Sequence, residues 1–526
     1  MQAYTEIITS RSDKRQYKCI QLDNGIRAIL IQDDEADKSC AALDVHVGAA
    51  LDPKPLYGTA HFLEHMLFMG TEKYPSENEY AEFITNNGGY NNAFTNLTDT
   101  NYHFEVSNEA FGEALDRFAQ FFLCPLLGDS QTEREMNAVD SEYNMSLQND
   151  QWRKFNLIQN IAHEESTLRR FLCGNLESLK QDGIRESLLN FHKTWYSSNI
   201  MNLVLYGKHS IEQLEQWATS LFAGVENKNV SVPDFGQPMM PFDSANMGQV
   251  ARYQPVKDKD QVEIYFVLPY IEQEFRASPL SYFSHLIGHE GENSLLSYLK
   301  QEDYAMDLSA GGDHELECFS DFTVCITLTK KGLANVDKVV DAVFKYVQRL
   351  KEVGPQEWVY NENRNIGTIT FDFLEKSNPM GYVVNLARHM PAYKNAADLS
   401  LILQHKYISS EYKPEMLNQV VDILADPAKA LIIVSSKSFE DSTLPIHEKW
   451  YKFNYSLEKM SEERINELRA PNVVDNGKLL DLPPQNNLIA TNFDVLAEEA
   501  SLSARPQLLS KFDGVADLWY LKDDRF

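Results

Sequence analysis

The chain has 526 residues, 43% of them hydrophobic, and a formal net charge of −29 at pH 7. This length exceeds what one core organises, so we expect two to four domains' worth of globular structure and exclude a disordered chain. The acidic balance argues against nucleic-acid binding, which draws on clustered Lys and Arg; it would attract basic peptides, although solubility alone also explains it.

Targeting and cysteine patterns point to the same compartment. Residues 1–15 contain no apolar signal-peptide core, and no segment approaches about 18 uninterrupted apolar residues, so we expect no membrane association. The six cysteines lack the paired spacing of a disulfide framework or a Cys-x-x-Cys metal site. We therefore predict a cytoplasmic protein with reduced cysteines.

The first elements predict an antiparallel sheet. Alternating residues around the Asn24-Gly25 turn indicate a hairpin over residues 19–31, and a third strand follows with Leu43 and Val45 on one face. An apolar helix over residues 58–68 comes next.

This helix carries three chemically active side chains. At about 100° per residue, His61, Glu64 and His65 point the same way. Two neutral imidazoles at this spacing can share one zinc ion, in the reversed His-x-x-Glu-His order. Glu64 lies too close in sequence to bind the same ion comfortably, but it can take a proton from a water on that ion, so its natural role is general base. The alternative is an amphipathic core helix that happens to carry histidines.

Two strands and two helices follow. Residues 90–95 and 101–106 predict strands, and the first has so few buried positions that it suits a sheet edge. Phe111, Phe118 and Phe122 lie on the apolar stripe of the next helix.

An acidic helix then offers a third ligand. The run Ser-Gln-Thr-Glu at residues 130–133 predicts a capping box, and Glu135 and Glu142 share a face of the helix that it opens. A catalytic zinc needs a third protein ligand and leaves its fourth position to water. Surface helices also carry glutamates at this spacing, so periodicity leaves the choice between these two residues open.

The order of elements then repeats after a polar linker over residues 225–247. The strand at 430–434, for example, parallels the strand at 200–206. The second copy contains His285, His289 and Glu290, but their order departs from His-x-x-Glu-His, and we predict that it is non-catalytic. We therefore divide the chain into a first domain, a second repeat domain and an irregular tail with a closing strand, over residues 1–247, 248–470 and 471–526.

Five stretches of the chain resemble the insulysin and pitrilysin family of inverted zinc peptidases. These stretches are residues 61–68, 74–80, 92–95, 114–122 and 137–142. The resemblance implies an α+β fold of two tandem homologous domains, each an antiparallel-rich mixed sheet covered by helices. It also implies a zinc metalloendopeptidase that hydrolyses peptides and small unfolded proteins, with the catalytic domain first.

The resemblance assigns roles to particular residues. His61, His65 and Glu142 would bind one Zn²⁺ per chain, with Glu64 as catalytic base and Glu135 assisting beside the metal. A strand that pairs with the substrate backbone would comprise Asn92, Ala93, Phe94 and Thr95. Gly311 and Gly312 resemble part of a secondary docking surface for the amino end of a substrate.

Long members of this family carry a further, inert half after the region matched here. The resemblance therefore implies a partner, either a carboxy-terminal half or a second subunit that closes the chamber. The alternative function is a peptide-binding or scaffold half-enzyme that needs a separate partner for activity.

Overall fold

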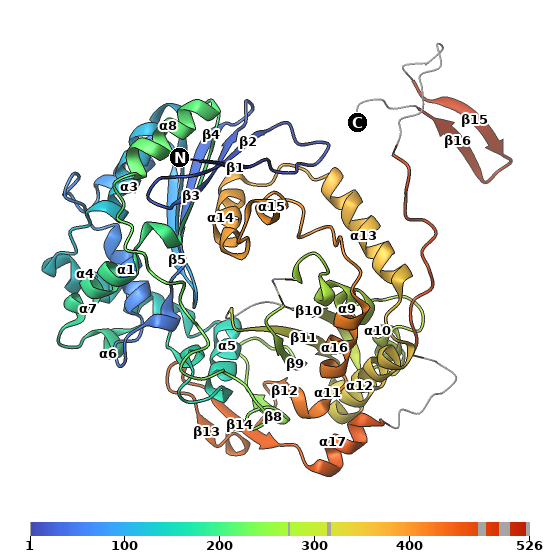
Figure 1. Ribbon diagram of the computed structural model, residues 1–526. Helices are drawn as coiled ribbons and strands as arrows, with labels where there is room; N and C mark the ends of the chain where they lie inside the picture. The colour runs from blue at the N-terminus through green and yellow to red at the C-terminus, as the bar shows by residue number, and fades with distance from the viewer. Residues whose placement is uncertain (1, 272–273, 313–316, 472–479, 494–504, 522–526) are drawn as a thin grey trace. The chain divides into compact units, whose positions relative to one another are not determined.

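The computed structural model describes residues 2–271, 274–312, 317–471, 480–493 and 505–521 (Figure 1). The chain forms two compact units, Met1–Gln485 and Asn486–Phe526. Parts of the predicted tail, residues 472–479, 494–504 and 522–526, lie outside the described residues.

The first seven-stranded sheet has the order β1-β2-β3-β7-β4-β6-β5. The predicted hairpin is its β2–β3 pair, and the parallel pairing of β3 with β7 makes the sheet mixed. Its strands are β1 (Gln2–Thr5), β2 (Gln16–Gln21), β3 (Arg27–Gln32), β4 (Lys38–Val45), β5 (Tyr90–Thr95), β6 (Thr100–Ser107) and β7 (Met201–Gly207).

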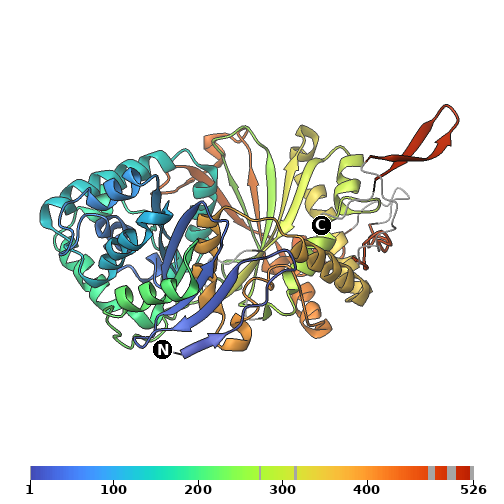
Figure 2. The ribbon, with the colours of Figure 1, turned by 90° about the horizontal axis from the view of Figure 1, so that it is seen from above.

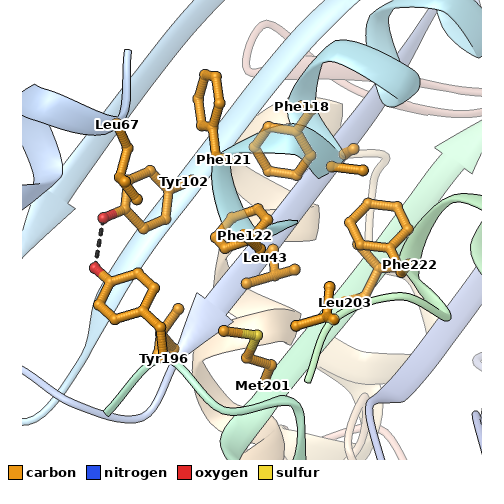
Figure 3. Packing of buried hydrophobic residues seen from close by; sticks show 14 of the residues in the cluster. Leu43, Leu67, Tyr102, Phe118, Phe121, Phe122, Tyr196, Met201, Leu203 and Phe222 are labelled. Atoms are coloured by element: carbon orange, nitrogen blue, oxygen red, sulfur yellow. Dashed lines mark hydrogen bonds between the residues drawn. The ribbon is translucent and has the colours of Figure 1, made fainter. Parts of the chain in front are cut away.

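Helices cover one face of this sheet, and their residues interleave with every second residue of the strands. Figure 3 shows Phe118, Phe122 and Phe222 packed over Leu43 and Leu203, with the predicted aromatic stripe fully buried. The helices and their neighbours in the chain are α1 (Thr59–Leu67), α2 (Glu79–Asn86), α3 (Phe111–Leu123), α4 (Asp129–Ser146), α5 (Asp150–Ile161), α6 (Leu176–Leu179), α7 (Ile184–Trp195) and α8 (Ile211–Phe222).

The predicted capping box at the start of α4 is wrong. The helix begins at Asp129 with Gly128 as its N-cap, so Ser130 already lies within the first turn. There its hydroxyl donates to the Gln131 side-chain oxygen, 3.0 Å away, and no side chain caps the start of α4.

The other face of the first sheet is covered by a later part of the chain, around α14 (Pro379–His389) (Figure 1). Val383 and Leu386 pack there against residues of β3, β4 and β7. The Arg27 guanidinium donates to the carbonyls of Tyr393 and Met390 at 2.6 and 2.9 Å. Residues within the predicted second domain thus complete the core of the first sheet.

The second seven-stranded sheet has the order β10-β11-β9-β12-β8-β14-β13. Read from its other end, it repeats the first: β12 pairs parallel with β8 and antiparallel with β9, as β7 does with β3 and β4. This confirms the predicted parallel between residues 430–434 and 200–206. The strands are β8 (Gln249–Tyr253), β9 (Gln261–Pro269), β10 (Ala305–Gly311), β11 (Phe319–Leu328), β12 (Ala430–Ser435), β13 (Ile446–His447) and β14 (Asn454–Lys459).

Helices also cover one face of the second sheet, drawn in yellow to orange in Figure 2. The helices of this part of the chain are α9 (Pro279–Ile287), α10 (Leu295–Gln301), α11 (Lys330–Leu333), α12 (Val336–Val353), α13 (Glu357–Asp372), α15 (Ala396–Leu399), α16 (Pro414–Leu424) and α17 (Glu462–Arg469). Among the described residues, none of the helices combines the length and apolarity needed to span a bilayer.

The second unit contains one antiparallel hairpin, β15 (Gln507–Phe512) with β16 (Ala516–Tyr520), which contains the predicted closing strand. Its large apolar side chains are unusually open, with Leu509, Phe512 and Trp519 exposed by 60%, 54% and 56%.

Candidate functional site

The start of α1 is fixed by a carboxylate from outside the helix. Gly58, its N-cap, has φ +86° and no side chain to cap the free N–H groups. Asp52 replaces that cap, since its two oxygens accept from the N–H groups of Gly58 at 2.6 Å and Ala60 at 2.8 Å. The sequence gives only an indirect signal for Asp52, namely a helix start without a capping side chain.

Three donor atoms meet where α1 lies beside α4 (Figure 1). Glu142 Oε2 lies 3.6 Å from His61 Nε2 and 3.4 Å from His65 Nε2. Ligand atoms of this set all lie within 4.8 Å of one another. A tetrahedral zinc ion about 2.0–2.2 Å from each ligand separates neighbouring ligand atoms by about 3.3–3.6 Å. The two distances from Glu142 match this spacing, and two imidazoles with one carboxylate are a ligand set that zinc takes.

Each histidine has a partner at its other ring nitrogen. His61 Nδ1 lies 2.7 Å from the Cys173 carbonyl oxygen, which can only accept, so Nδ1 carries the proton. His65 Nδ1 lies 3.3 Å from Glu135 Oε2. These contacts leave both Nε2 atoms available as ligands, as is usual for metal-binding histidines. Glu135 therefore lies beside the donor set and contacts His65 from the side away from Glu142.

Charge around His65 is strongly acidic. Burial lowers the pKa of His65, but the neighbouring carboxylates of Glu135 and Glu142 outweigh it and raise this pKa to about 10. A hydrogen bond from His65 to Glu142 in turn lowers the pKa of Glu142. The site is thus built to hold positive charge between its carboxylates.

Glu64 is buried on the same helix and is held by one hydroxyl group. Its Oε2 accepts a hydrogen bond from Thr95 Oγ1 at 2.6 Å. Burial raises the pKa of Glu64 above its ordinary value, against the opposing effect of His61 and this hydrogen bond. A raised pKa suits a general base, because the conjugate acid then forms more readily near neutral pH.

A cavity of about 580 Å³ joins the donor set to β5. The predicted edge position of β5 is confirmed, since among the described strands it pairs only with β6. The lining includes His61, Glu64, His65, Glu135, Glu142, Asn92, Ala93, Phe94, Thr95, Phe68, Trp152 and Cys173. The structure therefore brings together all the predicted site residues of the first domain.

The predicted glycines lie elsewhere and do not line this cavity. Gly311 ends β10, the edge strand of the second sheet. A Cβ at Gly312 would lie 2.4 Å from the Asp321 carbonyl oxygen, so no larger residue fits there without a shift.

Models of one peptidase family match the chain in succession. They are described as "Insulinase (Peptidase family M16)" over residues 27–174, "Peptidase M16 inactive domain" over 183–366 and "Middle or third domain of peptidase_M16" over 371–526. The chain belongs to peptidase family M16, the insulinase family, as its resemblance implied.

Individual relatives sharpen this assignment. The chain is 40% identical to insulin-degrading enzyme of Bos taurus over 526 residues, which cover 99% of this chain and 50% of that protein. It is 38% identical to A-factor-processing enzyme of Saccharomyces cerevisiae over 520 residues, 98% of this chain and 50% of that protein. The crystal structure of pitrilysin matches with a TM-score of 0.91 at 28% identity, over 98% of this chain and 54% of the pitrilysin chain.

These matches confirm the predicted α+β fold with helix-covered mixed sheets. The chain spans about half the length of the curated relatives it matches.

Proposed function

We propose that this chain is a zinc metalloendopeptidase that hydrolyses peptides and small unfolded proteins. The observation that carries the proposal is that the ligand atoms of His61, His65 and Glu142 lie within 4.8 Å of one another. Glu64, which directly precedes His65 in the chain, lines the same cavity. Membership of a peptidase family supports the reaction class.

Each residue has a distinct part in this proposal. His61, His65 and Glu142 hold one zinc ion, which when bound would lower the pKa of a water molecule and polarise the scissile carbonyl. Glu64 takes the proton of the attacking water and returns it to the leaving amine. Glu135 orients His65 through Nδ1 and so keeps its Nε2 directed at the metal.

The substrate would bind as an extra strand along β5. An edge strand offers unpaired main-chain groups to an extended peptide, and β5 forms a wall of the cavity that contains the base. Replacing Ala93 by proline should raise KM or abolish cleavage, because it removes a donor and distorts the strand. Ala93→Val, which keeps the backbone donor, is the matched control. Equal KM values for both variants would contradict strand addition.

A partner half is the second element of the proposal. Relatives are about twice as long as this chain, and the β15–β16 hairpin exposes several large apolar side chains. Closure over the cavity would exclude water and fix the peptide, effects worth several kcal/mol of barrier. The chain alone should therefore bind zinc but cleave slowly, and a separately expressed inert half should accelerate cleavage.

The predicted cytoplasmic location rests on the sequence pattern alone, and cell fractionation would test it.

The test combines metal analysis with hydrolysis of a quenched fluorogenic peptide by the purified chain. We expect about one zinc per chain and slow cleavage that a chelator abolishes and added zinc restores. Zinc-free protein from zinc-supplemented medium would refute the proposal. Stoichiometric zinc without cleavage, even after addition of the inert half, would favour the alternative of a peptide-binding or scaffold half-enzyme.

A further inference from the structure

A short aromatic loop of the second sheet, residues 448–453 between β13 and β14, contacts Tyr143 and Phe171, which lie close in the chain to groups of the proposed metal site. Glu448, only 2% exposed, folds this loop by accepting from the backbone N–H groups of Trp450 at 2.9 Å and of Tyr451. Figure 1 shows β13 and β14 next to α5, on the side of the second sheet that meets the first repeat. The Glu448 carboxylate thus holds the loop in one conformation.

The first connection runs to Glu142. The next residue on α4, Tyr143, is 3% exposed and donates its hydroxyl hydrogen bond to the Trp450 carbonyl. Its ring also packs edge-on against Tyr451, with 6.1 Å between the ring centroids. The position of α4 at its metal-ligating turn is therefore set by contacts with the loop.

The second connection runs to His61. The Trp450 indole stacks on Phe171, with ring centroids 4.2 Å apart and planes within 3°. Phe171 lies two residues before Cys173, whose carbonyl accepts the hydrogen bond from His61 Nδ1. The Trp450 side chain therefore packs on the segment whose carbonyl fixes the tautomer and orientation of His61.

We infer that Trp450 is a positioning residue for the metal site: its backbone carbonyl acts on Glu142 through Tyr143, and its indole acts on His61 through Phe171 and Cys173. This inference rests on the proposed zinc site. The second repeat then contributes more than a docking surface, since two of the three ligands take their placement from it. Metal affinity depends on such outer contacts because they preset the ligand atoms at the distances that the ion requires.

The test measures zinc affinity, by competition with a chromophoric chelator, beside thermal stability. Trp450 is only partly buried, so Trp450→Ala should fold and bind zinc about 10-fold more weakly. Trp450→Phe, which keeps a stacking ring, should restore most of the affinity. Tyr143→Phe, which removes one hydroxyl, should weaken zinc about threefold, a loss of roughly half a hydrogen bond's net value.

The matched control is Phe453→Leu. Phe453 belongs to the same buried cluster and is 4% exposed, but its ring lies against Tyr253, Tyr455 and the Arg153 guanidinium. It should lower the melting temperature as Trp450→Ala does and leave zinc affinity unchanged. Wild-type zinc affinity in Trp450→Ala, or equal losses in Phe453→Leu, would overturn the inference and leave the proposed function standing. Absence of zinc from the wild-type chain would overturn both.

Discussion

The two repeats place a pair of histidines at the same spacing, but only one pair forms a donor set. His61 and His65 both lie inside α1, and their ring centroids are 4.9 Å apart. The second pair, His285 and His289, follows β9, but α9 ends at Ile287. His289 therefore lies beyond the helix, and the two rings are 6.3 Å apart. A spacing of four residues brings side chains together only where the helix continues through both.

Charge distinguishes the pairs as well. Carboxylates raise the pKa of His65 to about 10 against the effect of burial, whereas burial lowers the pKa of His285 and of His289. Among the described residues, only His61, His65 and Glu142 bring three ligating side chains close enough for a metal. The second repeat thus has the same sheet order without a matching donor set, and the position before the second histidine, Glu64 in the first repeat, is Gly288 in the second.

The largest expected effect comes from removing the third ligand. Glu142→Ala should lose zinc and, with it, all turnover, because two imidazoles alone bind the ion weakly. Zinc per chain after desalting measures this. The control is Glu362→Ala on α13 of the second repeat, which should keep zinc. Stoichiometric zinc in Glu142→Ala would move the third ligand elsewhere, with Glu135 next in line.

Removing the base should cost about 10²–10⁴ in turnover and leave the metal in place. Glu64→Gln preserves the shape of the side chain but cannot take a proton. Steady-state hydrolysis together with zinc content checks this. Glu290→Gln in the second repeat is the control and should leave turnover unchanged. Retained turnover in Glu64→Gln would remove this residue from its role.

Glu135→Gln should have a smaller effect. The amide oxygen can still accept from His65 Nδ1 but carries no charge, so we expect zinc affinity to fall by about 10-fold. At saturating zinc the content should stay near one ion per chain while turnover is reduced. A loss of zinc as complete as in Glu142→Ala would refute the separate roles of these glutamates.

The smallest effect should follow loss of the hydroxyl that holds the base. Thr95→Val leaves the buried Glu64 carboxylate without that donor and should lower kcat about 10-fold or less, since the net contribution of one hydrogen bond is about 0.5–1.5 kcal/mol. KM and zinc content should not change, and Thr95→Ser should restore kcat. An equal rise in KM for both variants would show that Thr95 acts on the substrate instead.

Local patterns predicted much of this structure. Helical periodicity placed His61, Glu64 and His65 on one side of α1, and few buried positions marked β5 as an edge. Both signals arise within a single element, where side-chain direction follows from residue spacing. The choice between Glu135 and Glu142 depends on how α4 crosses α1, which spacing within α4 does not contain.

Other contacts of the site have no sequence pattern that would predict them. The Cys173 partner of His61 is a backbone carbonyl, which any residue possesses. Trp450 reaches α4 from a different sheet, so its relation to Tyr143 exists only once both sheets are folded. The capping box predicted for α4 was wrong for a related reason, because a Ser-x-x-Glu motif is equally compatible with the first turn of a helix that starts two residues earlier.

The segment around α14 implies an order in which the parts of the two repeats are completed as the chain is synthesised. Val383 and Leu386 cover Ile29, Ile31 and Val204 on the back of the first sheet, yet they are synthesised after all seven strands of that sheet. A nascent chain that has completed only the first repeat therefore presents this apolar face to water or to a chaperone. The two repeats are related as copies, but they are not independent folding modules. The second face of the first sheet is covered only after the residues of α14, well inside the second repeat, have been synthesised.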